Sequence, residues 1–315
     1  MKDLKLTETI PQFERIRSLP NQRVPKHLII LFFLAIAYWL CDQLGLIIVL
    51  TPISLALALS GHMQQSGPGY MTMMLYCTIV SIIINILIYK LIERRTGRTM
   101  GLTKHRCVSD YLIGGVLGLA MFSAVIGLNY AAGAVRVGSS DTPLNIPLML
   151  LFAGGWMIQG FSEEFAFRGF MMMSAGTYRK PWFAVIFSAV IFGCAHLGNN
   201  GVTVSGVLNV ALFGVIMSLY MLRTDSIWGA AALHSVWNWT QGSFFGLKVS
   251  GLDTGSSVLH FVQTDSAAWM NGGSFGLEGG LGTTIVQMIV ILFLLFLFPQ
   301  RKPAYPAAGE TPAEA

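Results

Sequence analysis

Long runs of apolar side chains are the feature that most limits what this chain can fold into. Only 11% of its 315 residues are charged and 54% are hydrophobic, whereas a soluble domain carries roughly 25% charged residues. The sequence therefore predicts an all-α, polytopic membrane helix bundle of about eight transmembrane helices, because a crossing needs about 20 apolar residues. The runs of that length begin near Leu28, Met71, Tyr111, Pro147, Trp182, Val204, Ile227 and Thr284.

The basic residues predict how these helices are oriented. If eight crossings start in the cytoplasm, most lysines and arginines fall on the cytoplasmic side, and only Arg136 and Lys248 fall outside. This distribution follows the positive-inside rule, so both termini are expected to be cytoplasmic. The first apolar run, 28–60, contains Asp42 and is interpreted as one span with an outer extension. If this run were two spans, the membrane orientation of every later helix would be inverted.

Composition also divides the chain into segments. Residues 1–27 form a basic cytoplasmic segment, and residues 28–299 form the membrane domain, in which 147–245 is a core of polar motifs. Segment 246–283 is a glycine-rich outer loop, whose composition favours flexibility; it is a lid or a plain connection, and no chemistry is assigned to it. The Pro- and Ala-rich tail, 300–315, is expected to be disordered.

The net charge and the cysteines exclude two classes of site. The net charge of +5 would indicate a nucleic-acid partner only if the basic residues were gathered on one face. They are scattered between apolar runs instead, so no nucleic acid is expected. The four cysteines show no paired spacing, which indicates neither a disulfide framework nor a cysteine-based metal site.

Ionisable residues within a span are functional candidates, because each costs roughly 2.5–3.5 kcal/mol to insert. The stretch GFSEEFAFRGF contains Glu163, Glu164 and Arg168. Residues four apart share a helix face, so Glu164 and Arg168 are expected to pair as a scaffold, whereas Glu163 points about 100° away. A carboxylate in apolar surroundings without that partner is suited to take a proton from water. Glu163 is therefore predicted to be a general base.

Two further spans carry polar residues with the same spacing. The stretch FGCAH has Phe192 one turn before His196, where it can pack against the imidazole ring. The stretch HSVWN has His234 one turn before Asn238, so both can donate hydrogen bonds to one developing oxyanion. A base, two imidazoles and a carboxamide on three helices can hydrolyse an amide with water, without a serine or cysteine nucleophile.

In this combination the residues resemble the CPBP family of intramembrane endopeptidases, also called the Abi or CAAX-protease family. Its motifs EExxxR, FxxxH and HxxxN or HxxxD occur here in order, at 163–168, 192–196 and 234–238. The resemblance covers about 147–245 and implies a membrane-embedded peptidase. It implies that Glu163 and His196 activate the water and that His234 and Asn238 stabilise the oxyanion, with support from Glu164, Arg168 and Phe192.

The family is often described as one of metalloproteases. Glu163, His196 and His234 would make a plausible set of two histidines and one carboxylate for Zn²⁺, with one open position. The HExxH arrangement is absent, however, and a base without a metal explains the same residues. A site that requires no cofactor is favoured, with Zn²⁺ as the alternative.

These features predict an enzyme of the hydrolase class, an endopeptidase in the lipid bilayer of a prokaryotic cell membrane. Its partner is a peptide or a membrane-associated protein substrate. Prenylated CAAX substrates follow only from the family's name, and leader peptides, bacteriocins or short signalling peptides are equally compatible with the sequence. Two alternatives stay open: an ion- or proton-coupled transporter, since acids and histidines in spans also mark ion routes, and a non-catalytic membrane protein of the bacteriocin-immunity type.

Overall fold

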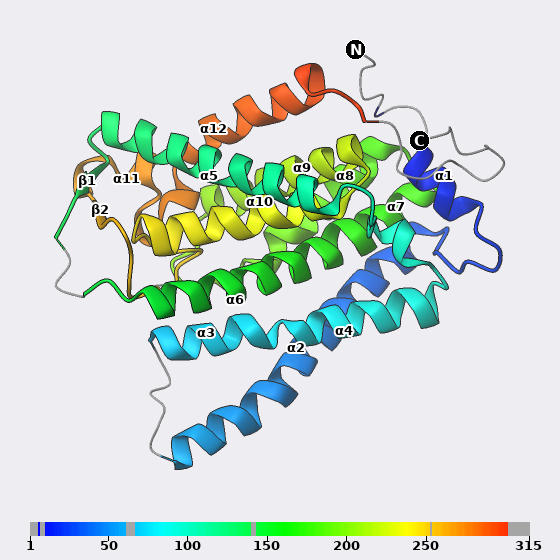
Figure 1. Cartoon of the computed structure of the whole chain (residues 1–315). Helices are drawn as coiled ribbons and strands as arrows, with labels where there is room; N and C mark the ends of the chain where they lie inside the picture. Colours follow the sequence, from blue (N-terminus) through cyan, green and yellow to red (C-terminus); the bar gives the residue numbers. More distant parts are fainter. Residues whose placement is uncertain (1–5, 7–9, 61–66, 140–142, 253, 302–315) are drawn as a thin grey trace.

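The computed structural model describes residues 6, 10–60, 67–139, 143–252 and 254–301. It is a helical membrane bundle (Figure 1). Four of its described helices pass into π-helical turns, namely α4 into Ile88–Ile92, α6 into Phe165–Met172, α10 into Thr240–Phe244 and α12 into Phe293–Leu297. The α-helices are α1 (Pro11–Arg17), α2 (Leu28–Leu59), α3 (Pro68–Cys77), α4 (Ile79–Leu87), α5 (Cys107–Ala131), α6 (Ile146–Glu164), α7 (Met173–Thr177), α8 (Pro181–Ala195), α9 (Val204–Thr224), α10 (Ile227–Trp239), α11 (Ala268–Asn271) and α12 (Leu281–Leu292).

The predicted apolar runs coincide with helices. Each of the eight runs begins close to a helix start, and the first run is one helix, as expected. Four helices in the described part of the chain are long and apolar enough to cross a membrane, namely Leu28–Leu59, Pro68–Ile92, Cys107–Ala131 and Val204–Thr224. Two shorter apolar helices are Pro181–Ala195 and Leu281–Leu297. The count of eight crossings stays a prediction, because α6 and α10, which carry polar motif residues, are not in either group.

Close helix contacts at glycine hold the centre of the bundle together. Helix α10 packs between α5 and α6. A Cβ on Gly160 of α6 would lie 2.5 Å from Ser235 Oγ on α10, and a Cβ on Gly114 of α5 would lie 2.0 Å from the Gly229 carbonyl oxygen. These backbones approach so closely because glycine adds no side chain between them. The contact at Gly160 lies beside the motif residues of both α6 and α10.

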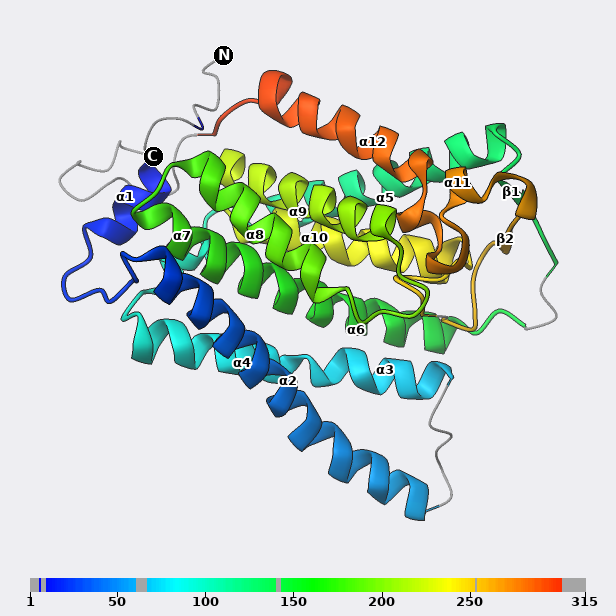
Figure 2. The same ribbon diagram turned by 180° about the vertical axis from the view of Figure 1, so that it is seen from behind.

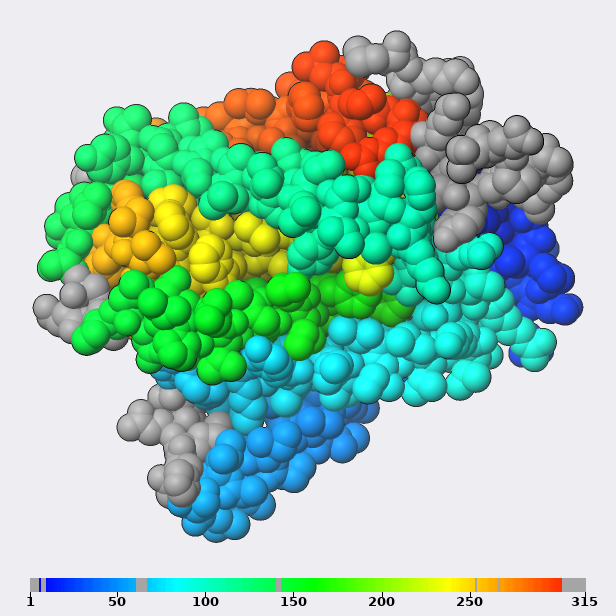
Figure 3. All heavy atoms as spheres, viewed as in Figure 1, coloured from blue at the N-terminus to red at the C-terminus, as the bar shows by residue number. Residues whose placement is uncertain are grey.

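Helix α2 stands apart from this centre. Figures 1 and 2 show it crossing α4 at an angle and diverging from α3 toward its C-terminal end, and in Figure 3 that end projects from the body of the molecule. The Tyr38 hydroxyl is hydrogen-bonded to Asn85 Nδ2 on α4, and the Tyr38 ring lies 5.5 Å from that of Phe170. These contacts attach the first half of α2 to the bundle.

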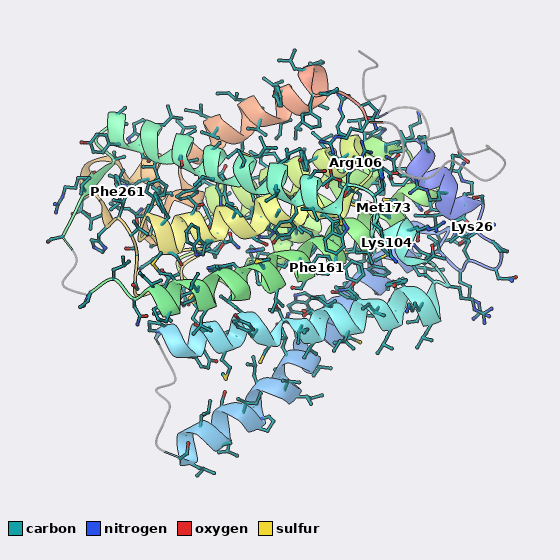
Figure 4. All side chains as sticks on the ribbon, in the orientation of Figure 1. Lys26, Lys104, Arg106, Phe161, Met173 and Phe261 are labelled. Carbon is teal, nitrogen blue, oxygen red and sulfur yellow. The ribbon has the colours of Figure 1, made fainter. Side chains whose placement is uncertain are left out.

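Basic residues gather at one end of the bundle. Figure 4 shows Lys26, Lys104 and Arg106 at this end, near α7, and Phe261 at the opposite end. Arg15 of α1 forms an ion pair of 2.8 Å with Asp225, which follows α9. This arrangement agrees with a single basic side of the membrane, and the assignment of that side to the cytoplasm stays a prediction.

The glycine-rich segment contains short ordered elements, which its composition did not predict. Strand β1 (Val135–Val137) pairs antiparallel with β2 (Phe261–Gln263). Asn209 of α9 donates hydrogen bonds to the carbonyl oxygens of Glu278 and Gly280, at 2.7 and 3.0 Å. The segment therefore packs on one end of the bundle. Of the predicted disordered tail, only Gln300 and Arg301 lie within the described residues.

Candidate active site

The three motifs meet at one cavity inside the bundle, with a volume of about 660 Å³. Glu163 reaches it from α6, His196 from the end of α8, and His234 and Asn238 from α10. Side chains of α2, α3 and α9, the residues 249–252 and Glu278 also line it. Helix packing thus brings motif residues that are far apart in the sequence to one space.

Glu164 and Arg168 form a buried ion pair beside the cavity, with the spacing expected from the sequence. Glu164 Oε1 lies 3.1 Å from Arg168 Nη1, and neither side chain is exposed. Between them α6 gives way to a π-helical stretch, Phe165–Met172, which continues into α7. The Arg168 guanidinium also lies over the Phe192 ring, 4.3 Å from its centroid, where cation and ring face attract each other. Arg168 is thereby joined to two of the three motifs.

His234 lies between two acids, and this position determines what its ring nitrogens can do. Nδ1 is 2.8 Å from Glu164 Oε1, and Nε2 is 3.7 Å from Glu163 Oε2. A carboxylate only accepts hydrogen bonds, so the Nδ1–H donates to Glu164. Nε2 then accepts in the neutral ring and donates only in the imidazolium. The predicted oxyanion role of His234 therefore requires the protonated ring.

Glu163 is the more accessible of the two acids, with 27% of its side chain exposed. Its Oε1 accepts a hydrogen bond of 2.5 Å from Gln159 Nε2. Its Oε2 has no hydrogen-bond partner among the described residues. The sequence predicted an acid outside the Glu164–Arg168 pair, and the structure adds an amide donor one turn earlier on α6.

Gln159 is a site residue that the sequence analysis missed. Its Nε2 donates to Glu163, and its Oε1 accepts a hydrogen bond of 3.2 Å from Asn238 Nδ2. One amide thus connects the acid on α6 with the carboxamide on α10. A signal was present, because Gln159 is a polar residue four positions before Glu163 and therefore shares its helix face.

His196 lies at the C-terminal end of α8 and packs on Phe192, as its spacing predicted. The two rings are T-shaped, with centroids 4.8 Å apart. His196 Nδ1 is 2.9 Å from the Phe192 carbonyl oxygen. Since a carbonyl only accepts, Nδ1–H is the donor, and Nε2 of the neutral ring is left as an acceptor.

The candidate zinc ligands do not meet as one compact group in the described residues. Within the described part of the chain, no group of three His, Cys, Asp or Glu side chains is placed so that it could hold a metal ion. Glu163, His196 and His234 border the same cavity. Because Nδ1 of His234 is bonded to Glu164 and Nδ1 of His196 to a backbone carbonyl, Nε2 of each ring is the nitrogen that could hold Zn²⁺. The site that requires no cofactor stays a prediction.

Fold and site together define an integral membrane protein with acid, imidazole and carboxamide groups around one internal cavity. Residues 145–240 match the family model described as type II CAAX prenyl endopeptidase, Rce1-like. This range includes α6 to α10 and every residue of the three motifs, so the match confirms the resemblance and supports an intramembrane endopeptidase. No curated protein and no solved structure matches the chain.

Proposed function

We propose that this protein is an intramembrane endopeptidase that hydrolyses a peptide bond with a water molecule activated by Glu163 and His196. One observation carries the proposal: Glu163, His196, His234 and Asn238 line a single cavity. The 3.7 Å between Glu163 and His234 is within the reach of one bound water. The match to the endopeptidase family model over the same residues supports it.

In this proposal Glu163 takes a proton from the water while the water oxygen attacks the carbonyl carbon of the substrate. Nε2 of neutral His196 accepts a hydrogen bond from the same water and orients it. The proton on Glu163 passes to the leaving amine when the C–N bond breaks, so the carboxylate is regenerated.

The oxyanion that forms during the attack needs donors. Asn238 Nδ2 has two hydrogens, and its bond to Gln159 uses one of them, so the other can donate to the oxyanion. His234 donates from Nε2 when its ring is protonated, with Glu164 holding the other nitrogen. Two donors aimed at one developing charge are the usual device for acyl transfer.

The proposed substrate is a peptide or a membrane-associated protein within the bilayer of a prokaryotic plasma membrane. The description of the matching family suggests prenylated CAAX proteins. Leader peptides, bacteriocins and short signalling peptides fit the same chemistry.

The test is peptide release in proteoliposomes, followed by mass spectrometry of the membrane-associated peptides. We expect Glu163→Gln, which keeps the shape and removes the base, to lower the cleavage rate by about 10²- to 10⁴-fold. The control is Glu14→Gln, which removes a carboxylate from α1, at the basic end of the bundle. Equal cleavage by wild type and Glu163→Gln would contradict the proposal.

Two other outcomes would redirect the assignment. Uptake driven by a pH gradient and abolished in Glu163→Gln would indicate a transporter. Protection against a toxin that survives joint replacement of Glu163, His196 and His234 would indicate a non-catalytic immunity protein.

A further inference from the structure

Asp42 is a charged residue that the proposed chemistry does not use. It is the single charged residue among the 32 residues of α2. A carboxylate in the middle of an apolar spanning helix is costly and usually serves a function. The sequence alone suggests a polar boundary or a helix break at this point, but α2 is continuous through Asp42.

The structure directs Asp42 to the cavity that contains the motif residues. It lies one turn after Tyr38, whose contacts with Asn85 and Phe170 turn that face of α2 toward the bundle. Both Tyr38 and Asp42 line the cavity with Glu163. Asp42 therefore faces the site rather than lipid.

One oxygen of the Asp42 carboxylate is left unsatisfied by the described residues. Its Oδ1 is buried without a hydrogen-bond partner among the described residues. Its Oδ2 has a long contact, 3.5 Å from Gln43 Nε2, and the Ser81 side chain also interacts with the carboxylate. A buried polar oxygen of this kind favours binding of a donor that enters the site.

The cavity lining contains several acidic side chains. The carboxylates in its lining belong to Asp42, Glu163 and Glu278, and no lysine or arginine is among the described residues that line it. Glu278 already accepts hydrogen bonds from the backbone N and the Oγ of Ser250, at 2.6 and 2.8 Å. Glu163 is assigned to the chemistry, so Asp42 is the acid that is left for recognition.

We propose that Asp42 binds a basic side chain of the substrate, so that the enzyme selects peptides with a lysine or arginine near the cleaved bond. This inference rests on the proposed function and adds a substrate class to it. A cation is attracted by carboxylates that have no lysine or arginine beside them in a cavity. Trp39 and Tyr70 line the same cavity and offer apolar and aromatic surface to the aliphatic stem of such a side chain.

The test compares quenched fluorescent peptides that differ at one position, where each carries lysine, its uncharged analogue norleucine, or glutamate. The protein is reconstituted whole in liposomes. We expect the kcat/KM of wild type to be about tenfold or more higher for the lysine peptide than for the norleucine peptide. The difference should lie in a lower KM for the lysine peptide. We expect Asp42→Asn to lose this preference while it still cleaves the norleucine peptide, and Asp42→Lys to favour the glutamate peptide. Glu14→Gln is the control for loss of one negative charge.

Binding measurements separate this inference from the proposed function. In nanodiscs that carry Glu163→Ala, the lysine peptide should bind more tightly than the norleucine peptide, and adding Asp42→Asn should remove the difference. One outcome is that wild type cleaves none of the peptides while the binding preference for lysine is present. In that case the endopeptidase proposal fails and recognition by Asp42 stands. An equal lysine preference with and without Asp42→Asn overturns the inference. So does an Asp42→Asn variant that cleaves all three peptides more slowly by the same factor.

Discussion

The two sides of the cavity are built by different means. The motif wall, formed by α6, α8 and α10, is held by a glycine contact at Gly160, a buried ion pair and the Gln159 amide. The α2 wall, formed by cavity-lining residues of α2 such as Tyr38 and Asp42, has few such contacts. Only 11% of the residues in the most apolar window of α2 are buried, against 61% in α9, which packs on α8 and α10 of the motif wall.

This difference suggests a division of tasks. Reacting groups must keep their mutual geometry to a fraction of an ångström, which a densely bonded wall provides. A wall with few contacts can adjust to side chains of different size, which suits substrate recognition. The comparison can be tested on each wall, because contacts in the motif wall should contribute more to stability than those in the α2 wall.

The largest effect is expected from the buried ion pair in the motif wall. Glu164→Gln leaves the Arg168 charge buried without its counter-ion, which should lower the free energy of unfolding by about 3–5 kcal/mol. The double variant Glu164→Gln with Arg168→Met removes both charges and should recover most of that loss. Unfolding in mixed micelles with increasing SDS measures the stability of the single and the double variant. A single variant as stable as wild type would show that the pair does not hold the wall.

The contact between α6 and α10 should give the next largest effect. In Gly160→Ala the new Cβ meets Ser235 Oγ at 2.5 Å, so the helices must separate, at a cost of about 1–3 kcal/mol. Gly127→Ala on α5 is the matched control, because a Cβ there meets nothing within 4 Å. The same unfolding assay compares the two. Equal stability of both variants would contradict a tight contact at Gly160.

Gln159 tests whether the motif wall also positions its acid. Gln159→Leu removes the hydrogen bonds to Glu163 and Asn238, and we expect kcat to fall about tenfold with KM unchanged, equivalent to about 1.4 kcal/mol. Gln159→Glu keeps an acceptor for Asn238 but cannot donate to Glu163, and it should be impaired as well. Steady-state kinetics on one peptide measures kcat and KM for both variants and for wild type. A rise in KM alone would assign Gln159 to substrate binding instead.

The smallest effect is expected in the α2 wall. Tyr38→Phe removes the hydroxyl that bonds Asn85, and an interhelical hydrogen bond in a membrane contributes only about 0.6 kcal/mol on average. Cleavage of an uncharged peptide should be nearly unchanged, because the motif wall is intact. Tyr130→Phe, at an exposed position, is the control. A loss of stability as large as that of Glu164→Gln would remove the contrast between the walls.

Much of the fold and part of the site could be predicted from local patterns. Length and hydropathy predicted the helix starts, because a membrane helix satisfies its own backbone hydrogen bonds and needs no partner to form. Spacing of four residues predicted the contacts of Glu164 with Arg168 and of Phe192 with His196, since these lie within one stretch of helix. Gln159 carried the same signal.

Other features depend on distant residues, and the sequence could not predict them. The π-helical stretch Phe165–Met172 has no marker in its composition. Helix α2 is apolar on all sides, so its periodicity cannot show which face Asp42 occupies. The order in 246–283 arises from pairing with β1 and from hydrogen bonds to Asn209, both far away in the chain.

The sequence by itself determined that the chain forms membrane helices and which side chains share a helix face, because both follow from the local geometry of a helix. Only the tertiary structure decided that His234 lies between two acids, that Gln159 joins α6 to α10, and that Asp42 lines the same cavity as Glu163. Those relations depend on the rotation and crossing of whole helices, and packing sets these through contacts at positions such as Gly160.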